Sequence, residues 1–382
     1  MSMVFISNDN PRLRQDLREK YADTDCIFID KEKILEEISE IRNNEAVIVL
    51  PNSDLKKISE DLYKLGIYKV SVFPIDLFQG VNDGKIIEIN NKNPRLSRLE
   101  LEVTPQCNLK CKGCTHYCNL TSDEDNIDFE KYKSSLIRLK QLFWGVHLLR
   151  LMGGEPLMNP DYLRFVKTAR EIFPDANIQL VSNGLLILKL TSEELNEIKK
   201  NRCSFAISYY PPLKKKLKEI KDILDKHGVE YDISPPIKFF FKTLVDIPHE
   251  SSERSFKQCM FSQCHSMLDG ELSICGLSIY SYRINREFDL NIPSEDKIDI
   301  FSTKKTGWEI EQMFKVPHDM CRYCHTAMVP FRWSTRPRFK AVKEDYLVEN
   351  NKLNMVVLPN IQRLAMPVLK RMYALYGKMR HY

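Results

Sequence analysis

Three cysteines in one short segment, Cys107, Cys111 and Cys114, have the residue type and the CxxxCxxC spacing to hold a metal cluster. They follow residues 99–103, whose alternation predicts a strand with one buried face. Three thiolates can hold three corners of a cubane iron–sulfur cluster, which four cysteines would close. The fourth iron is then open to a substrate or cofactor, as in zinc sites that keep one open position. A zinc site or a cysteine-rich loop without metal is the structural alternative.

Two further motifs follow the cysteine segment in order, Gly153-Gly154-Glu155-Pro156 and Ser182-Asn183-Gly184 after Val181. Together, the three motifs resemble the radical S-adenosylmethionine (SAM) superfamily, whose open iron chelates the amino and carboxylate groups of SAM. The resemblance covers roughly residues 98–236. The family pattern usually has an aromatic residue before the third cysteine, and this position is Gly113 here.

The resemblance implies a SAM site at these motifs. The two glycines would let the backbone approach the methionyl group, and the carboxylate after them would lie near the SAM amino group. Polar residues at later strand ends would meet the ribose hydroxyls or the SAM carboxylate, or could simply be turn residues. An ordinary loop carboxylate is the alternative for Glu155. The expected SAM contacts are Gly153, Gly154, Glu155, Pro156, Ser182, Asn183 and Ser208.

The chemistry implied by the resemblance is reductive cleavage of SAM. An electron from the reduced cluster breaks a carbon–sulfur bond, giving methionine and a 5′-deoxyadenosyl radical that abstracts hydrogen from a substrate. His116 and Cys118 follow the third ligand and are interpreted as packing or supporting residues. No catalytic side chain is assigned.

A second group of cysteines lies further along the chain. Asp269-Gly270 predicts a tight hairpin that delivers Cys275, and Cys321 with Cys324 forms a CxxC. This group resembles the shortened (twitch) form of the SPASM auxiliary-cluster domain, because the chain has no cysteine after Cys324. The resemblance implies one additional cluster, with Cys264 competing for the place given to Cys259. A zinc knuckle is the alternative, which His265 and His325 keep open. The expected auxiliary ligands are Cys259, Cys275, Cys321 and Cys324.

Length and composition place the chain among soluble globular proteins of two or three domains. It has 382 residues, of which 43% are hydrophobic and 29% charged. A net charge of +5 does not argue for a nucleic-acid partner, and none is expected. The first residues lack the features of a signal peptide, and no stretch approaches the ~18 apolar residues of a membrane span. Eleven cysteines without an export signal favour metal ligation in a reducing cytoplasm.

The first 78 residues alternate apolar runs with amphipathic stretches, which predicts a small parallel α/β domain. A dinucleotide site is not expected there because no GxGxxG follows the first strand. Residues 79–97 read as a linker or an exposed hairpin. The expected strands are Val4–Ser7, Cys26–Ile29, Ala46–Leu50 and Lys69–Phe73, and the expected helices are Pro11–Tyr21, Lys31–Asn43 and Ser53–Leu65.

From Arg98 the order strand, loop, helix repeats, which predicts a partial (β/α)6 barrel with its chemistry at the carboxyl ends of parallel strands. Asp128, Asn159 and Thr191 are the expected N-caps of successive helices, with Glu194 completing a capping box. The expected later strands are His147–Met152, Asn177–Val181, Cys203–Tyr209 and Val229–Ile233. The expected domains are a small α/β domain (1–78), a linker (79–97), the radical SAM barrel (98–250), an auxiliary-cluster domain (251–340) and a tail (341–382).

Two basic segments close the chain. Residues 330–338 place three arginines around Trp333, which suits a phosphorylated or nucleotide-linked substrate or a solvated loop. Residues 364–382 predict a basic amphipathic helix. We expect this helix to dock on the barrel, and peripheral contact with an anionic membrane is the alternative.

The sequence therefore predicts an α/β radical SAM enzyme of the oxidoreductase or epimerase type. Its expected cofactors are a [4Fe–4S] cluster, SAM and a second iron–sulfur cluster, and its expected partners are a small-molecule substrate and an electron donor such as flavodoxin or ferredoxin. A saccharide, polyol or nucleotide-linked molecule is the preferred substrate class. A peptide maturase and a non-catalytic iron–sulfur or zinc protein are the alternatives.

Overall fold

The computed structural model describes residues 60–64, 66, 92–122, 125–248, 251–259, 261–262, 264–335 and 340–349, with the backbone alone at 326–328. It also gives the backbone of residues 55–59 and of the first five strands. Two compact units divide the chain. The first comprises Met1–Leu96, Leu139–Gly145 and Lys305–Glu311, and the second comprises Ser97–Arg138, Val146–Lys304 and Gln312–Tyr382. Most of the expected barrel and most of the expected auxiliary domain thus fall in the second unit.

The first unit contains a five-stranded sheet in the order β2-β1-β3-β4-β5. The first four strands pair in parallel, as predicted. The segment expected to be a linker or exposed hairpin instead contains β5, which pairs antiparallel with β4, and the start of the next strand. An edge strand of this kind is common on parallel sheets. The bounds are β1 Ser2–Ser7, β2 Asp25–Asp30, β3 Ala46–Val49, β4 Lys69–Val72 and β5 Ile87–Asn90.

One of the three helices expected in this unit is described. It is α3, Leu55–Lys64, which is followed by Gly66 with φ of +76°. The helices expected at 11–21 and 31–43 lie outside the described residues.

The second sheet has eight strands in the order β10-β9-β8-β7-β6-β12-β13-β14. Helices α5, Tyr162–Ile172, and α6, Ser192–Lys200, pack on β8 and β9 respectively. The other helices of the repeat are α4, Phe129–Leu142, and α7, Leu217–His227. The bounds of the repeated strands are β6 Arg95–Thr104, β7 Gly145–Gly153, β8 Asn177–Ser182, β9 Cys203–Ile207 and β10 Tyr231–Ile233.

The sixth parallel strand is not where a (β/α)6 repeat would place it. It is β12, Ser266–Leu268, which pairs in parallel with β6 at the opposite end of the repeat from β10. It comes from the segment expected to form the auxiliary domain. The hairpin from β12 to β13, Glu271–Ser273, turns at Asp269-Gly270, as predicted, and continues antiparallel to β14, Lys297–Asp299.

Local signals position the helices of the second unit. The Asp128 carboxylate accepts the backbone N–H groups of Glu130 and Lys131, and Thr191 forms the predicted capping box with Glu194. The prediction at Asn159 was wrong. Because Glu155–Met158 forms a capped 3₁₀ turn, α5 begins only at Tyr162, after Asp161.

Strand β6 is buried on both faces from Leu99 to Thr104, whereas its alternation predicted one buried face. The reason is that its two glutamates are neutralised inside the protein. Glu102 is paired with Arg283, and Glu100 is paired with Arg98 and Arg150. Charged residues are rarely buried unless they are paired in this way.

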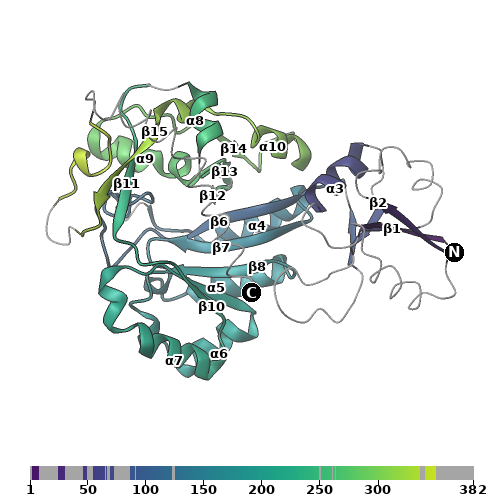
Figure 1. Cartoon of the computed structure of the whole chain (residues 1–382), viewed down its shortest axis with the longest axis horizontal. Helices are drawn as coiled ribbons and strands as arrows, with labels where there is room; N and C mark the ends of the chain where they lie inside the picture. Colours follow the sequence, from purple (N-terminus) through teal and green to yellow (C-terminus); the bar gives the residue numbers. More distant parts are fainter. Residues whose placement is uncertain are drawn as a thin grey trace. The chain divides into compact units, whose positions relative to one another are not determined.

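The C-terminal part of the second unit adds a two-stranded ribbon and further helices (Figure 1). The ribbon is β11, Phe239–Leu244, antiparallel to β15, Cys324–Arg332. The helices are α8, Ser252–Gln258, and α9, Gly276–Phe288, and an apolar core joins α9 to Tyr117 and Tyr346. None of the described helices is long and apolar enough to cross a membrane. The expected tail helix lies outside the described residues.

Candidate functional site

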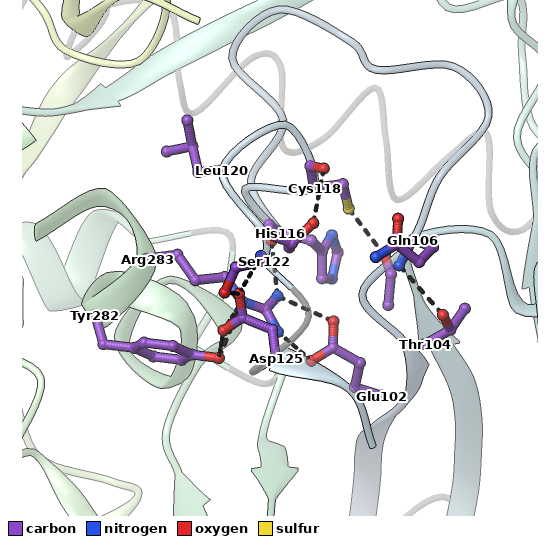
Figure 2. A network of polar contacts seen from close by, with 12 residues as sticks. Glu102, Thr104, Gln106, His116, Cys118, Leu120, Ser122, Asp125, Tyr282 and Arg283 are labelled. Carbon is purple, nitrogen blue, oxygen red and sulfur yellow. Dashed lines mark hydrogen bonds and ion pairs between the residues drawn. The ribbon is translucent and has the colours of Figure 1, made fainter. Parts of the chain in front are cut away.

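The cysteine loop begins where β6 ends, and the GGEP segment holds its first residues. The backbone N–H of Gly154 donates to the carbonyl of Thr104 at 2.7 Å, and that of Glu155 donates to the carbonyl of Gln106 at 2.8 Å. Thr104 and Gln106 are seen at the base of the loop in Figure 2. The loop and the end of β7 are therefore one hydrogen-bonded structure.

This packing explains why Gly153 and Gly154 are glycines without invoking the approach of SAM. A Cβ added to Gly153, whose φ is +120°, would lie 2.5 Å from the carbonyl oxygen of Thr104 and 2.6 Å from Cγ of Glu102. A Cβ added to Gly154 would overlap the carbonyl of Gln106. The chain's own backbone therefore requires glycine at both positions.

The three thiols of the loop lie close enough to influence one another's ionisation. Burial raises the pKa of Cys107 to about 11, and the charge of Cys114 adds to this effect. Burial also raises the pKa of Cys111 above its usual range, with contributions from Cys114 and Cys107. Cys107 and Cys111 thus resist ionisation as protein groups, and a cluster would suit them, because metal binding deprotonates thiols and neutralises their charge.

Cys114 differs from the other two. The hydrogen bond between Cys114 and Cys118 holds the pKa of Cys114 well below its usual range, and His116 adds to this effect. The Sγ atoms of Cys114 and Cys118 are 3.8 Å apart. Cys118, labelled in Figure 2, is buried with its thiol 3.7 Å from the carbonyl of Gly153. His116 and Cys118 thus contact Cys114 and favour its thiolate form, which agrees with their interpretation as packing or supporting residues.

A segment distant in sequence lies along the loop. Thr335 forms an antiparallel bridge with Cys111, and the backbone N–H of Lys112 donates to Ser334 at 3.0 Å. The indole N–H of Trp333 donates to Sγ of Cys111 at 3.2 Å. The residues expected to bind substrate or face solvent therefore contact the cysteine loop, although Arg336 and Arg338 lie outside the described residues.

The same segment explains the departure from the family pattern at Gly113. A Cβ at this position would lie 2.6 Å from the Phe331 ring and 2.7 Å from the Asp345 carbonyl. Gly113 also has φ of +60°, which disfavours any side chain. An aromatic ring is thus present beside position 113, but β15 provides it.

Glu155 is fully buried and its carboxylate is held within the chain. It accepts the Ser182 hydroxyl and the backbone N–H of Asn183, both at 2.7 Å, and the backbone N–H of Leu157 at 3.3 Å. Burial raises its pKa to about 7 although these hydrogen bonds oppose the shift. Glu155 therefore ties the end of β7 to the end of β8.

Asn183 connects this tie to the cysteine loop, because its side-chain amide donates to Oδ1 of Asn108 at 2.7 Å. The backbone N–H of Ser208 donates to the carbonyl of Ser182 at 2.8 Å, so the ends of β8 and β9 are also joined. Pro156 is buried as the first residue of the turn after β7. The structure thus brings the predicted residues together at the carboxyl ends of adjacent strands.

Tyr210 is a residue of this site that the sequence did not reveal. Burial, and then the charges of Cys111, Cys114 and Cys107, raise its pKa well above the usual value, so its phenol lies near all three thiols. Its ring stacks on Trp333 with centroids 5.4 Å apart. Its place after a strand end, before two prolines, was the only sequence signal.

A buried polar network lies on the other side of the loop (Figure 2). The Arg283 guanidinium donates to both carboxylate oxygens of Glu102, at 3.0 and 2.7 Å, and to the carbonyl of His116 at 3.1 Å. Asp125 accepts the Tyr282 hydroxyl at 2.8 Å and Arg286 at 2.7 Å. Helix α9 is thereby fixed to β6 and to the segment that follows the cysteines.

The second cysteine group surrounds a cavity of about 60 Å³. Its lining includes all four expected auxiliary ligands and His325, whereas Cys264 is not among the described lining residues. Burial raises the pKa of Cys275 to about 12, and Cys259 and Cys321 contribute. Burial also raises the pKa of Cys264 to about 11, but there the largest charge effect comes from Glu100, and that of Cys259 is smaller.

Among the described residues, no three His, Cys, Asp or Glu side chains are placed to hold a single metal ion. A cubane cluster places each thiolate on a different iron, so its ligands are more widely spaced than those of one ion.

One family model matches part of the chain. Residues 101–232 match the family model of the Radical SAM superfamily. GTP 3′,8-cyclase of Campylobacter jejuni subsp. doylei is 25% identical over 168 residues, which are 41% of this chain and 49% of that protein. Molybdenum cofactor biosynthesis protein 1 of Dictyostelium discoideum is 30% identical over 149 residues, covering 36% of this chain and 23% of that protein. The chain spans about half the length of the curated cyclase it matches.

Solved structures give partial similarity. BtrN in complex with AdoMet and 2-DOIA has 20% identity and a TM-score of 0.40, covering 67% of this chain and all of that one. Native anSMEcpe with bound AdoMet has 19% identity and a TM-score of 0.30, covering 37% of this chain and 43% of that one.

Proposed function

We propose that the chain is a radical SAM enzyme that cleaves SAM reductively at a [4Fe–4S] cluster and takes hydrogen from a small molecule, since residues 101–232 match the model of that superfamily. The single observation that carries the proposal is the loop of Cys107, Cys111 and Cys114. This loop is hydrogen-bonded to the strand ends of β7 and β8. Three close thiols at the carboxyl ends of parallel strands fit a cluster with one open iron.

The cofactors of the family are the cluster and SAM. When bound, the reduced cluster supplies the electron that cleaves SAM, and the 5′-deoxyadenosyl group then takes a hydrogen atom from the substrate. The chain's residues hold and shield these groups. Tyr210 and Trp333 present a stacked pair of rings beside the thiols, which limits access of water to the loop.

SAM would lie against the ends of β7, β8 and β9, where the proposed contacts are Gly153, Gly154, Glu155, Pro156, Ser182, Asn183 and Ser208. Within this set, Glu155 and Ser182 act by positioning, because their polar groups already bond each other and the backbone. Ser208 is only partly buried, and no hydrogen bond of its hydroxyl is found among the described residues. Ser208 is therefore the strongest side-chain candidate for a direct SAM contact.

A second, auxiliary cluster is the proposed occupant of the cavity between α8 and α9. Cys259, Cys275, Cys321 and Cys324 all line it and influence one another's ionisation. This grouping supports Cys259 over Cys264 as the fourth ligand. Zinc is the competing occupant by ligand type, because four cysteines suit both and His325 also lines the cavity. No three of the described side chains, however, are placed to hold a single ion.

The proposed substrate is a saccharide or a nucleotide-linked small molecule that is oxidised or epimerised, with an electron from a flavodoxin or ferredoxin. The name of the curated relatives, GTP 3′,8-cyclase, supports nucleotide chemistry. The exposed Arg332 beside Trp333 would suit a phosphate group.

The test is to incubate reduced, reconstituted protein with SAM and panels of deuterated nucleotides, sugar nucleotides and peptides. Deuterium should appear in 5′-deoxyadenosine with a nucleotide-linked substrate. Transfer from a peptide alone would replace this proposal with a peptide maturase.

A further inference from the structure

The contact between the Trp333 side chain and Cys111 is supported by backbone pairing of the residues on either side of it. Trp333 precedes Ser334 and Thr335, which are bonded to Lys112 and bridged to Cys111 respectively. The carbonyl of Cys111 also accepts the side-chain amide of Asn119 at 2.7 Å. The indole nitrogen is thereby held 3.2 Å from the Cys111 sulfur.

The orientation of the indole ring is fixed from its other side. The backbone N–H of Trp333 donates to the carbonyl of Lys238 at 2.9 Å, and the indole ring stacks on Tyr210 with an interplanar angle of 25°. Tyr210 in turn packs edge-on against Phe240, with centroids 5.9 Å apart. The stack on Tyr210 and the backbone hydrogen bond to Lys238 thus fix the plane of the indole ring in which its N–H faces the thiol.

We propose that the Trp333 indole N–H is a dedicated hydrogen-bond donor to the Cys111 thiolate of the cluster and raises the cluster's reduction potential. The inference rests on the proposed function, since it requires a cluster on this loop. The indole N–H of tryptophan can only donate a hydrogen bond, so the sulfur must be the acceptor. Reduction adds negative charge to the cluster and its sulfurs. A fixed donor therefore stabilises the reduced form more than the oxidised form.

The test compares Trp333→Phe with the wild-type protein by redox titration of the anaerobically reconstituted cluster, followed by electron paramagnetic resonance. The phenyl ring retains stacking on Tyr210 and lacks the donor. We expect the ratio of reduced to oxidised cluster at a fixed potential to fall on the order of tenfold. For one electron, this is a shift of about 59 mV to more negative potential.

Trp144→Phe is the matched control, because its indole N–H is buried without a hydrogen-bond partner among the described residues. This variant should titrate as the wild type does. A shift of the same size in both variants would show that loss of any indole perturbs the cluster, and would overturn the role of Trp333.

A second measurement needs no substitution at Trp333. Tryptophan labelled with ¹⁵N in the indole ring should give a nuclear coupling to the reduced cluster in pulsed electron paramagnetic resonance, and Trp144→Phe should keep it. A wild-type cluster without ¹⁵N coupling, or equal potentials in Trp333→Phe and wild type, would overturn this inference alone. Failure of the wild-type protein to assemble a cluster would overturn the proposed function as well.

Discussion

The guanidinium of Arg283 and the carboxylate of Glu102 form a two-point ion pair with neither side chain exposed to solvent (Figure 2). Glu102 lies on β6, three residues before the cysteine loop begins its turn at Pro105, and Arg283 lies on α9 beyond Cys275. The pair therefore connects the strand that carries one cysteine group to the helix that follows a cysteine of the other.

Arg283→Met should destabilise the protein strongly, because it leaves Glu102 charged and buried without a partner. Breaking such a pair costs about 3–5 kcal/mol. Chemical unfolding of the apoprotein measures the loss. Arg286→Met is the matched control on the same helix, since Arg286 is 38% exposed and its pair with Asp125 faces solvent on one side.

Arg283→Met combined with Glu102→Leu should recover a large part of the loss, because no buried charge remains. A single variant that unfolds like the wild type, or a double variant that is as unstable as the single one, would contradict the importance assigned to the pair.

Gly154→Ala should prevent assembly of the first cluster. The added methyl group would overlap the Gln106 carbonyl, so the start of the cysteine loop must move away from the end of β7. Iron and sulfide content after reconstitution should fall by one cluster. Gly145→Ala is the control, because its Cβ would be 3.5 Å from the nearest atom, an ordinary contact with Arg95. Equal cluster content in the two variants would show that the loop tolerates the displacement.

Glu155→Gln should remove a pH dependence of stability. The folded chain raises the pKa of Glu155 from 4.5 to about 7, so the folded state binds this proton more tightly. The resulting stabilisation is complete below pH 4.5 and is lost as the pH rises through about 7. Between these values, the wild-type apoprotein should lose on the order of 3 kcal/mol relative to Glu155→Gln in urea unfolding. Parallel pH profiles would refute the shifted pKa.

Cys259→Ala should lower the iron content of the reconstituted protein by one cluster, whereas Cys264→Ala should leave it unchanged. The reason is that Cys259 lines the cavity with the other three cysteines. The reverse outcome would exchange the two assignments. Stoichiometric zinc in the wild type, with iron for a single cluster, would show that the cavity holds a zinc ion.

The motifs of the site could be located from the sequence because each is local. The CxxxCxxC loop, GGEP and Ser-Asn-Gly each lie at the end of a predicted strand, and parallel strands bring their carboxyl ends together. The capping signals at Asp128 and Thr191 were sufficient for the same reason. At Asn159 the prediction failed because a 3₁₀ turn capped by Glu155 occupies the preceding residues. The helix therefore begins at Tyr162, two residues after the predicted start at Pro160.

Long-range pairings could not be predicted. Trp333 and Cys111 are 222 residues apart, and Arg283 and Glu102 are 181 apart. A single sequence contains no information on which distant segment lies beside a loop. For the same reason, Gly113 read as a departure from a pattern until Phe331 was found next to it. Burial of both glutamates on β6 also depends on partners from other elements, so the strand's alternation was misleading.

The most direct measurement of the central claim is formation of 5′-deoxyadenosine from SAM by the anaerobically reconstituted and reduced protein. The wild-type chain should form it, and a variant with Cys107, Cys111 and Cys114 all replaced by alanine should not. The variant should still retain iron at the second cysteine group, which shows that it is folded. If the triple variant still forms 5′-deoxyadenosine, the assignment of this loop as the SAM-cleaving site is wrong.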